Sequence, residues 1–204
     1  SAILEIKEFS GLFRMLISRQ LRIRYRQTTL GFAWAILQPI LLMAMFTALF
    51  SRIPRMGPEG VPYALFILAG LIPWQYFSRA FSEGTNCLLG ESGLISKVYF
   101  PRLIIPLIVV IVGLIDLIVP MMILILVVVI FSFDSISMNL IYLPLFLLFQ
   151  AIFIMGVILW TAPLNIKYRD IRMLVPFLTM CLMFCSPVIF QLDFLGPLLK
   201  NILS

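Results

Sequence analysis

The chain has 204 residues, of which 62% are hydrophobic and 12% are charged, and its formal net charge is +6. A soluble domain carries roughly 25% charged residues, so this composition excludes an ordinary soluble protein. The sequence holds no histidine and no Gly-rich P-loop, which excludes His-based catalysis, His-ligated metals and ATP hydrolysis by this chain.

Apolar stretches long enough to cross a hydrocarbon core, which takes roughly 20 helical residues, recur along the chain. They cover five ranges, 31–50, 63–81, 103–131, 140–162 and 174–190. Helices are expected because every backbone amide in lipid must be paired within its own segment, and no barrel-type alternation appears. The sequence therefore predicts one all-α, polytopic transmembrane domain over 1–204.

The positions of the lysines and arginines predict the orientation. The N-terminal arm and the segments after the second and fourth spans are rich in both residues, whereas the opposite connections hold Arg52, Arg55 and Lys200. Basic residues near span ends are retained on the cytoplasmic side. We therefore expect a multi-pass plasma-membrane protein with a cytoplasmic N-terminus.

The N-terminal segment, residues 1–29, combines an amphipathic helix with a basic arm. Over residues 3–17, one helical face carries Ile6, Phe9, Phe13, Leu16 and Ile17. This pattern predicts a helix lying in the membrane interface. Arg22, Arg24 and Arg26 follow at headgroup depth, where they either anchor the topology or, with Tyr25, bind a phosphate or pyrophosphate.

The connection over 83–102 is too polar to cross a membrane. Glu91 and Ser92 are typical of a helix start, and Pro101 is typical of a helix end. Such a short helix is either a contact for a soluble partner or a connector lying on the surface. The later connection carries the Lys-Tyr-Arg-Asp cluster that begins at Lys167, for which structural anchoring is the default interpretation.

Asp116 lies near the middle of the third predicted span. An acid at that depth costs about 2.5 to 3.5 kcal/mol on insertion scales, so it should face protein or water. No basic residue is expected at the same depth. Asp116 is therefore protonated or bonded to a neighbouring helix, and both structural packing and a proton relay stay open.

Four stretches together are similar to one transporter family: "RYRQTTLGFAWAILQP", "AGLIPWQYF", "LISKVYFPR" and "NIKYRDIRMLVPF". In this order and spacing they resemble the permease subunit of bacterial polysaccharide ABC exporters of the ABC-2 class. That family moves lipid-linked O-antigen, capsule or teichoic-acid chains across the inner membrane. The resemblance covers roughly residues 5–195.

The resemblance implies a homodimer in which each permease docks an ATPase subunit that binds ATP and Mg. It also implies six spans, so 191–204 is expected to be an external segment before a sixth span beyond Ser204. The ATPase coupling residues would be Gly93, Leu94, Lys97, Tyr99, Phe100 and Arg102. The substrate entrance would hold Arg22, Arg24, Tyr25, Arg26, Lys167 and Arg169, and the translocation path Trp34, Phe177 and Phe184.

The predicted function is a transport subunit, not an enzyme, that exports lipid-linked polysaccharide and carries no cofactor or metal of its own. One alternative is an ABC-2 exporter of small lipophilic compounds or drugs. A membrane-bound transferase acting on a lipid phosphate is less favoured, because Glu91 and Asp170 are lone acids. Membrane lipids are expected partners, whereas nucleic acid is not, because the basic residues are sorted by membrane side.

Overall fold

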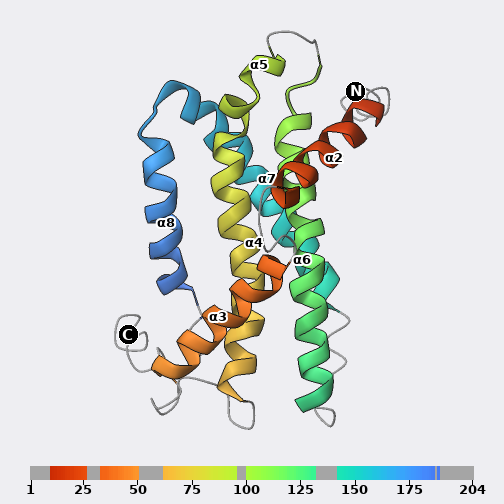
Figure 1. Cartoon of the computed structure of the whole chain (residues 1–204). Coiled ribbons are helices and arrows are strands. Elements are labelled where there is room, and N and C mark those ends of the chain that lie inside the picture. Colours follow the sequence, from red (N-terminus) through yellow and green to blue (C-terminus); the bar gives the residue numbers. More distant parts are fainter. Residues whose placement is uncertain are drawn as a thin grey trace.

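The described part of the chain is helical. The computed structural model describes residues 10–26, 33–50, 62–95, 100–131, 142–186 and 188. Figure 1 shows the helices in order: α2 (Ser10–Arg26), α3 (Ala33–Phe50), α4 (Tyr63–Gly90), α5 (Ser92–Ile95), α6 (Ile104–Phe131), α7 (Leu143–Lys167) and α8 (Ile171–Cys185). The all-α prediction is confirmed for these residues.

Helices α6 and α7 are long and apolar enough to cross a membrane. Much of α6 is Val and Ile, whose branched side chains lower helix propensity in water. In lipid the requirement to pair every backbone group within the segment overrides that preference. Helix α6 matches the predicted third span, 103–131, to within one residue, whereas α7 ends five residues beyond the predicted fourth span, 140–162.

Helix α4 is the centre of the bundle and packs against α3, α6, α7 and α8. Two glycine contacts allow close packing. A Cβ at Gly84 would lie 2.3 Å from Ile158 Cδ1, and one at Gly113 would lie 2.7 Å from Tyr76 Cε2. These glycines therefore let α7 and α6 approach α4 more closely than any larger residue would allow.

Helix α4 continues to Gly90, beyond the predicted span end at residue 81. Its polar extension packs on α7. Asn165 Nδ2 donates to Thr85 O at 2.9 Å, and the hydroxyl oxygens of Thr85 and Thr161 lie 3.1 Å apart. Because Thr85 forms hydrogen bonds with both Thr161 and Asn165 of α7, the helix persists where composition alone indicated a connection.

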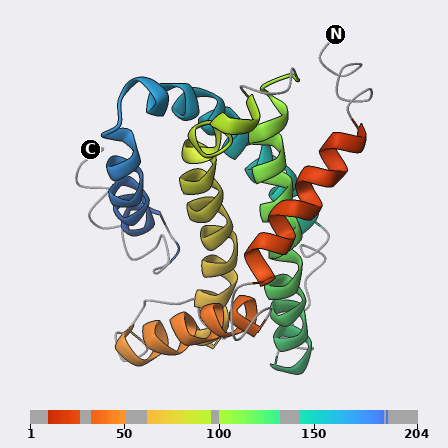
Figure 2. The same cartoon turned by 45° about the horizontal axis from the view of Figure 1, so that its top comes forward.

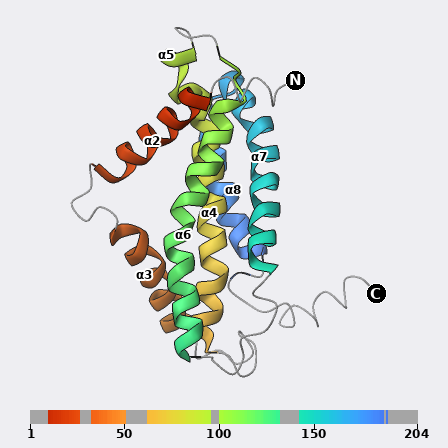
Figure 3. The same cartoon turned by 90° about the vertical axis from the view of Figure 1, so that its right-hand side faces the viewer.

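Helix α2 packs obliquely on α6 (Figure 3). We expected its apolar face to lie in the membrane interface. Instead Leu16 is buried in the protein core, with Phe13 and Ile17 packed against it. The helix also continues through the basic arm to Arg26, while residues 3–9 lie outside the described part of the chain.

The two remaining helices flank the bundle. Figure 2 shows α3 lying across one end of α4 and α6 instead of running parallel to them. Helix α8 is separated from α6 and packs on α4 and α7. Its described length, Ile171–Cys185, begins and ends a few residues before the predicted fifth span.

Candidate functional site

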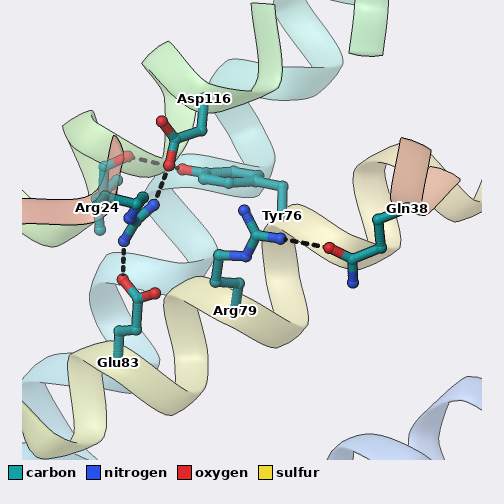
Figure 4. A network of polar contacts seen from close by, with 7 residues as sticks. Arg24, Gln38, Tyr76, Arg79, Glu83 and Asp116 are labelled. Atoms are coloured by element: carbon teal, nitrogen blue, oxygen red, sulfur yellow. Dashed lines mark hydrogen bonds and ion pairs between the residues drawn. The ribbon is translucent and has the colours of Figure 1, made fainter. Parts of the chain in front are cut away.

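A cluster of polar side chains lies where α2, α3, α4 and α6 meet. We call it the Arg24 cluster, and Figure 4 shows its members: Arg24, Gln38, Tyr76, Arg79, Glu83 and Asp116. Arg24 Nη1 donates to Asp116 Oδ2, and its Nη2 donates to Glu83 Oε2. One guanidinium therefore ties α2 to both α6 and α4.

Two further hydrogen bonds extend the cluster across the bundle. Arg79 Nη2 donates to Gln38 Oε1 at 3.0 Å and joins α4 to α3. Tyr76 Oη donates to Val110 O at 3.2 Å and joins α4 to α6. The same group of side chains thus connects four helices.

The charges of the cluster balance, because Arg24 and Arg79 face Glu83 and Asp116. The side chain of Asp116 is 6% exposed, that of Arg24 is 21% exposed and that of Glu83 is 41% exposed. Charges removed from water persist when they are paired and hydrogen-bonded. Solvent exposure within the cluster therefore increases from the buried acid on α6, Asp116, to the accessible acid on α4, Glu83.

A small cavity of about 30 Å³ lies within the cluster. A water molecule needs about 10 to 15 Å³, so the space suits one or two waters. Gln75 Nε2 belongs to a residue that lines this cavity, and it is buried with no hydrogen-bond partner in the described part of the chain.

The expectation that no basic residue reaches the depth of Asp116 is wrong, because Arg24 pairs with it. Asp116 is bonded to a neighbouring helix, which is one of the alternatives that the sequence left open. The partner comes from 92 residues away in the chain. It reaches Asp116 because α2 continues as a helix through the basic arm and packs on α6.

The predicted entrance residues form two separate groups within this chain. Arg22 is exposed, and its Nε donates to Ser18 O of its own helix at 3.4 Å. Lys167 and Arg169 are exposed at the turn between α7 and α8. Figure 3 shows α2 and α7 on opposite sides of α4 and α6. The side chains of Tyr25 and Arg26 lie outside the described part.

The predicted coupling segment is described at its two ends. Helix α5 covers Ser92–Ile95, with Gly93 exposed. The side chain of Leu94 and all of Lys97 and Tyr99 lie outside the described residues. Phe100 is buried in the core and anchors the end of the segment, whereas Arg102 is exposed. Of the two, Arg102 is therefore the one that a partner could contact.

A second ionic contact joins α2 to the start of this segment. Arg19 Nη1 lies 3.1 Å from Glu91 Oε2, directly before α5. Sequence reasoning missed the roles of Arg19, Glu83 and Arg79. A signal was available, because Arg79 and Glu83 are four residues apart and therefore share a helix face.

The predicted translocation residues on α8 are open to their surroundings. Phe177 is 65% exposed and Phe184 is 51% exposed. The side chain of Trp34 lies outside the described residues. Cys181 and Cys185 are exposed free thiols on the same helix, and within the described ranges no group of three or more acids and cysteines is arranged to hold a metal.

Long apolar helices that enclose a balanced set of charges define a multi-pass helical membrane protein. The chain belongs to the ABC-2 type transporter family, which matches residues 11–203. The match includes every described helix except the first residue of α2.

Relatives with assigned names are similar over most of this chain. The O-antigen export system permease protein RfbA of Myxococcus xanthus is 28% identical, covering 93% of this chain and 72% of the relative. A permease of the same name from Klebsiella pneumoniae is 25% identical, covering 89% and 71%. The polysialic acid transport protein KpsM of Escherichia coli is 29% identical over a shorter region, 39% of this chain and 31% of the relative.

Proposed function

We propose that this chain is the permease subunit of an ATP-driven exporter of lipid-linked polysaccharide in a bacterial inner membrane. The observation that carries the proposal is similarity to O-antigen export permeases across the whole described bundle. The names of these relatives do not favour export of small lipophilic compounds. In this proposal the N-terminus and the α4–α6 connection face the cytoplasm.

The permease would work as a homodimer with an ATPase bound to each copy. ATP and Mg would be bound by that partner, since this sequence has no P-loop. Helix α5 and the exposed Arg102 would receive the movement of the ATPase, and the buried Phe100 would transmit it to the core. This division of roles follows from which side chains are accessible.

The polymer would pass along α8. Phe177 and Phe184 present flat rings away from the bundle, and sugar rings can stack their C–H faces on such surfaces. Trp34 would complete this path. The exposed Arg22, Lys167 and Arg169 would attract the anionic headgroup at the interface, together with Tyr25 and Arg26. Pairing of two copies would bring the entrance groups of different chains together.

The test is to delete the gene in its host and measure lipid-linked glycan on the cytoplasmic side and polymer on the cell surface. Complementation with the wild-type gene is the positive control, and an Arg102→Glu variant tests coupling. Internal accumulation with loss of surface polymer is expected for the deletion. An unchanged glycan distribution, together with loss of efflux of a lipophilic dye, would instead favour the small-molecule exporter.

A further inference from the structure

Beyond Leu21, which still packs against the core, the end of α2 is attached to the bundle by charge. Leu16, near the middle of the helix, is buried in the core. Toward the end of the helix, Arg22 and Ile23 are exposed. Among the side chains described in this turn, Arg24 is the one that forms ion pairs with other helices.

A cavity of about 410 Å³ lies beneath the same turn. It separates α2 from α4 and is lined by residues of both helices and of α6. The lining residues that matter are Ile23 and Arg24 of α2, Glu83 and Cys87 of α4, and Glu91 directly after α4. The turn thus borders an open groove that it does not fill, and Arg24 crosses this groove to reach Glu83.

The guanidinium of Arg24 is occupied in this conformation, with one nitrogen on each of two carboxylates. The same planar fork is suited to binding phosphate with two hydrogen bonds. A phosphate can use it fully only by replacing Asp116 and Glu83. Arg22, by contrast, is exposed and hydrogen-bonds within its own helix, so it can attract such a group first.

Electrostatics determines which way the turn would move after that exchange. With Arg24 removed, the cluster keeps one base, Arg79, against two acids, Glu83 and Asp116, and so has a formal charge of −1. This charge repels a phosphate. A phosphate bound to Arg24 would therefore draw the turn away from α4 and α6 instead of entering the cluster.

We propose that Arg24 is a latch: Asp116 and Glu83 hold the end of α2 closed, and a phosphate-bearing headgroup at the membrane interface opens it by taking over the guanidinium. The latch itself follows from the contacts described above. Its role in substrate entry rests on the proposed function, because the lipid-linked substrate would be one source of the phosphate.

Cys87 provides a native reporter of the opening. It is buried and lines the cavity beneath α2. It lies beyond the predicted span 63–81, and burial raises the pKa of its thiol to about 11. Alkylation proceeds through the thiolate. Opening of the turn should speed alkylation for two reasons. The reagent gains access to Cys87, and the pKa of the thiol moves back toward its ordinary value.

The experiment uses the full-length permease in nanodiscs of neutral phosphatidylcholine. Cys181 and Cys185, both exposed, are replaced by serine, so that Cys87 is the reporter thiol. The rate of maleimide alkylation is compared for wild type, Arg24→Gln and the matched control Arg14→Gln, an exposed position on the same helix. We expect Arg24→Gln to be faster by about tenfold, because a charge-assisted pair that favours the closed position is lost. Equal rates in Arg24→Gln and Arg14→Gln would overturn the latch.

A double variant separates latching from general destabilisation. Arg24→Gln alone leaves a buried acid without its partner, which could loosen the whole bundle. Arg24→Gln with Asp116→Asn removes that unpaired charge but does not restore the ion pairs. The latch predicts that alkylation stays fast in the double variant. A return to the wild-type rate would show that the single variant was merely destabilised.

Two probes then test the phosphate. Phosphatidic acid is added to the nanodiscs, or inorganic pyrophosphate to the buffer, and Cys87 alkylation is measured in wild type and Arg24→Gln. Faster alkylation in wild type, with no further increase in Arg24→Gln, supports the proposal. A response to phosphatidic acid alone indicates a membrane headgroup, and a response to pyrophosphate shows that the anion suffices. No response to either probe overturns phosphate release. Because this readout needs no transport, failure of the export assay with a responsive latch would count against the proposed function alone.

Discussion

Asp116→Asn gives the most direct measure of what the Arg24 cluster contributes to stability. The substitution keeps the size and one hydrogen-bond acceptor of the side chain but removes its charge. Removing one partner of a fully buried ion pair costs about 3 to 5 kcal/mol. Arg24 keeps Glu83 as a partner and is 21% exposed, so we expect a smaller loss, about 1.5 to 3 kcal/mol, typical of a hydrogen bond to a charged group.

Thermal unfolding of the purified protein measures this loss. For a chain of this size, 1 kcal/mol corresponds to a shift of roughly 2 to 4 °C in Tm, so Asp116→Asn should lower Tm by several degrees. The double-mutant cycle with Arg24→Gln isolates the pair. A coupling energy below about 0.5 kcal/mol, the usual limit of additivity between independent sites, would refute the ion pair as a stabilising contact. Export that survives in Asp116→Asn would also exclude a proton relay at this residue.

Three further outcomes follow from packing and burial. Gly84→Val should destabilise the protein severely, because even an added Cβ would lie 2.3 Å from Ile158 Cδ1. Gly156→Ala, at an open position, is the control for this thermal-unfolding comparison. Asn165→Leu should cost about 1 to 3 kcal/mol in unfolding free energy, because Thr85 O loses its side-chain partner. Alkylation of Cys87 should keep accelerating as pH rises toward about 11, because its thiol ionises only there; a plateau near neutral pH would contradict its burial.

The sequence predicted best the long apolar helices, α6 and α7, which both helix packing and a lipid environment favour. The limits of α6 and α7 follow from long, predominantly apolar runs, so composition located them within five residues. It placed the end of α4 nine residues early, at 81 instead of 90, because polar residues there suggested a connection. The partners of Thr85 and Asn86 lie on α7 and that of Glu83 lies on α2, and tertiary contacts of this kind leave no local signal.

The same limitation explains the site. Charge and position singled out Arg24 and Asp116 separately, one as an interface arginine and the other as an intramembrane acid. Their pairing depends on the direction in which α2 runs after its apolar face meets α6, which the order of spans does not determine. Intramembrane charges are rarely left without a partner. A search for a base able to compensate Asp116 would therefore have been a sound guide to Arg24.

The α4–α7 contact and the contact between the end of α2 and the bundle differ in strength, and this difference indicates which part moves. Helices α4 and α7 are held by the close approach at Gly84 and by a buried chain of hydrogen bonds through Thr85, Thr161 and Asn165. Separating them would expose several polar groups at once, each costing about 1 to 3 kcal/mol if left unpaired. Beyond Leu21, which packs on the core, α2 is held by the ion pairs of Arg24, and Arg19 adds one to Glu91. A push delivered near α5 should therefore shift α4 and α7 as one body, and the movement should occur at the ion pairs that Arg19 and Arg24 of α2 form with Glu91, Glu83 and Asp116.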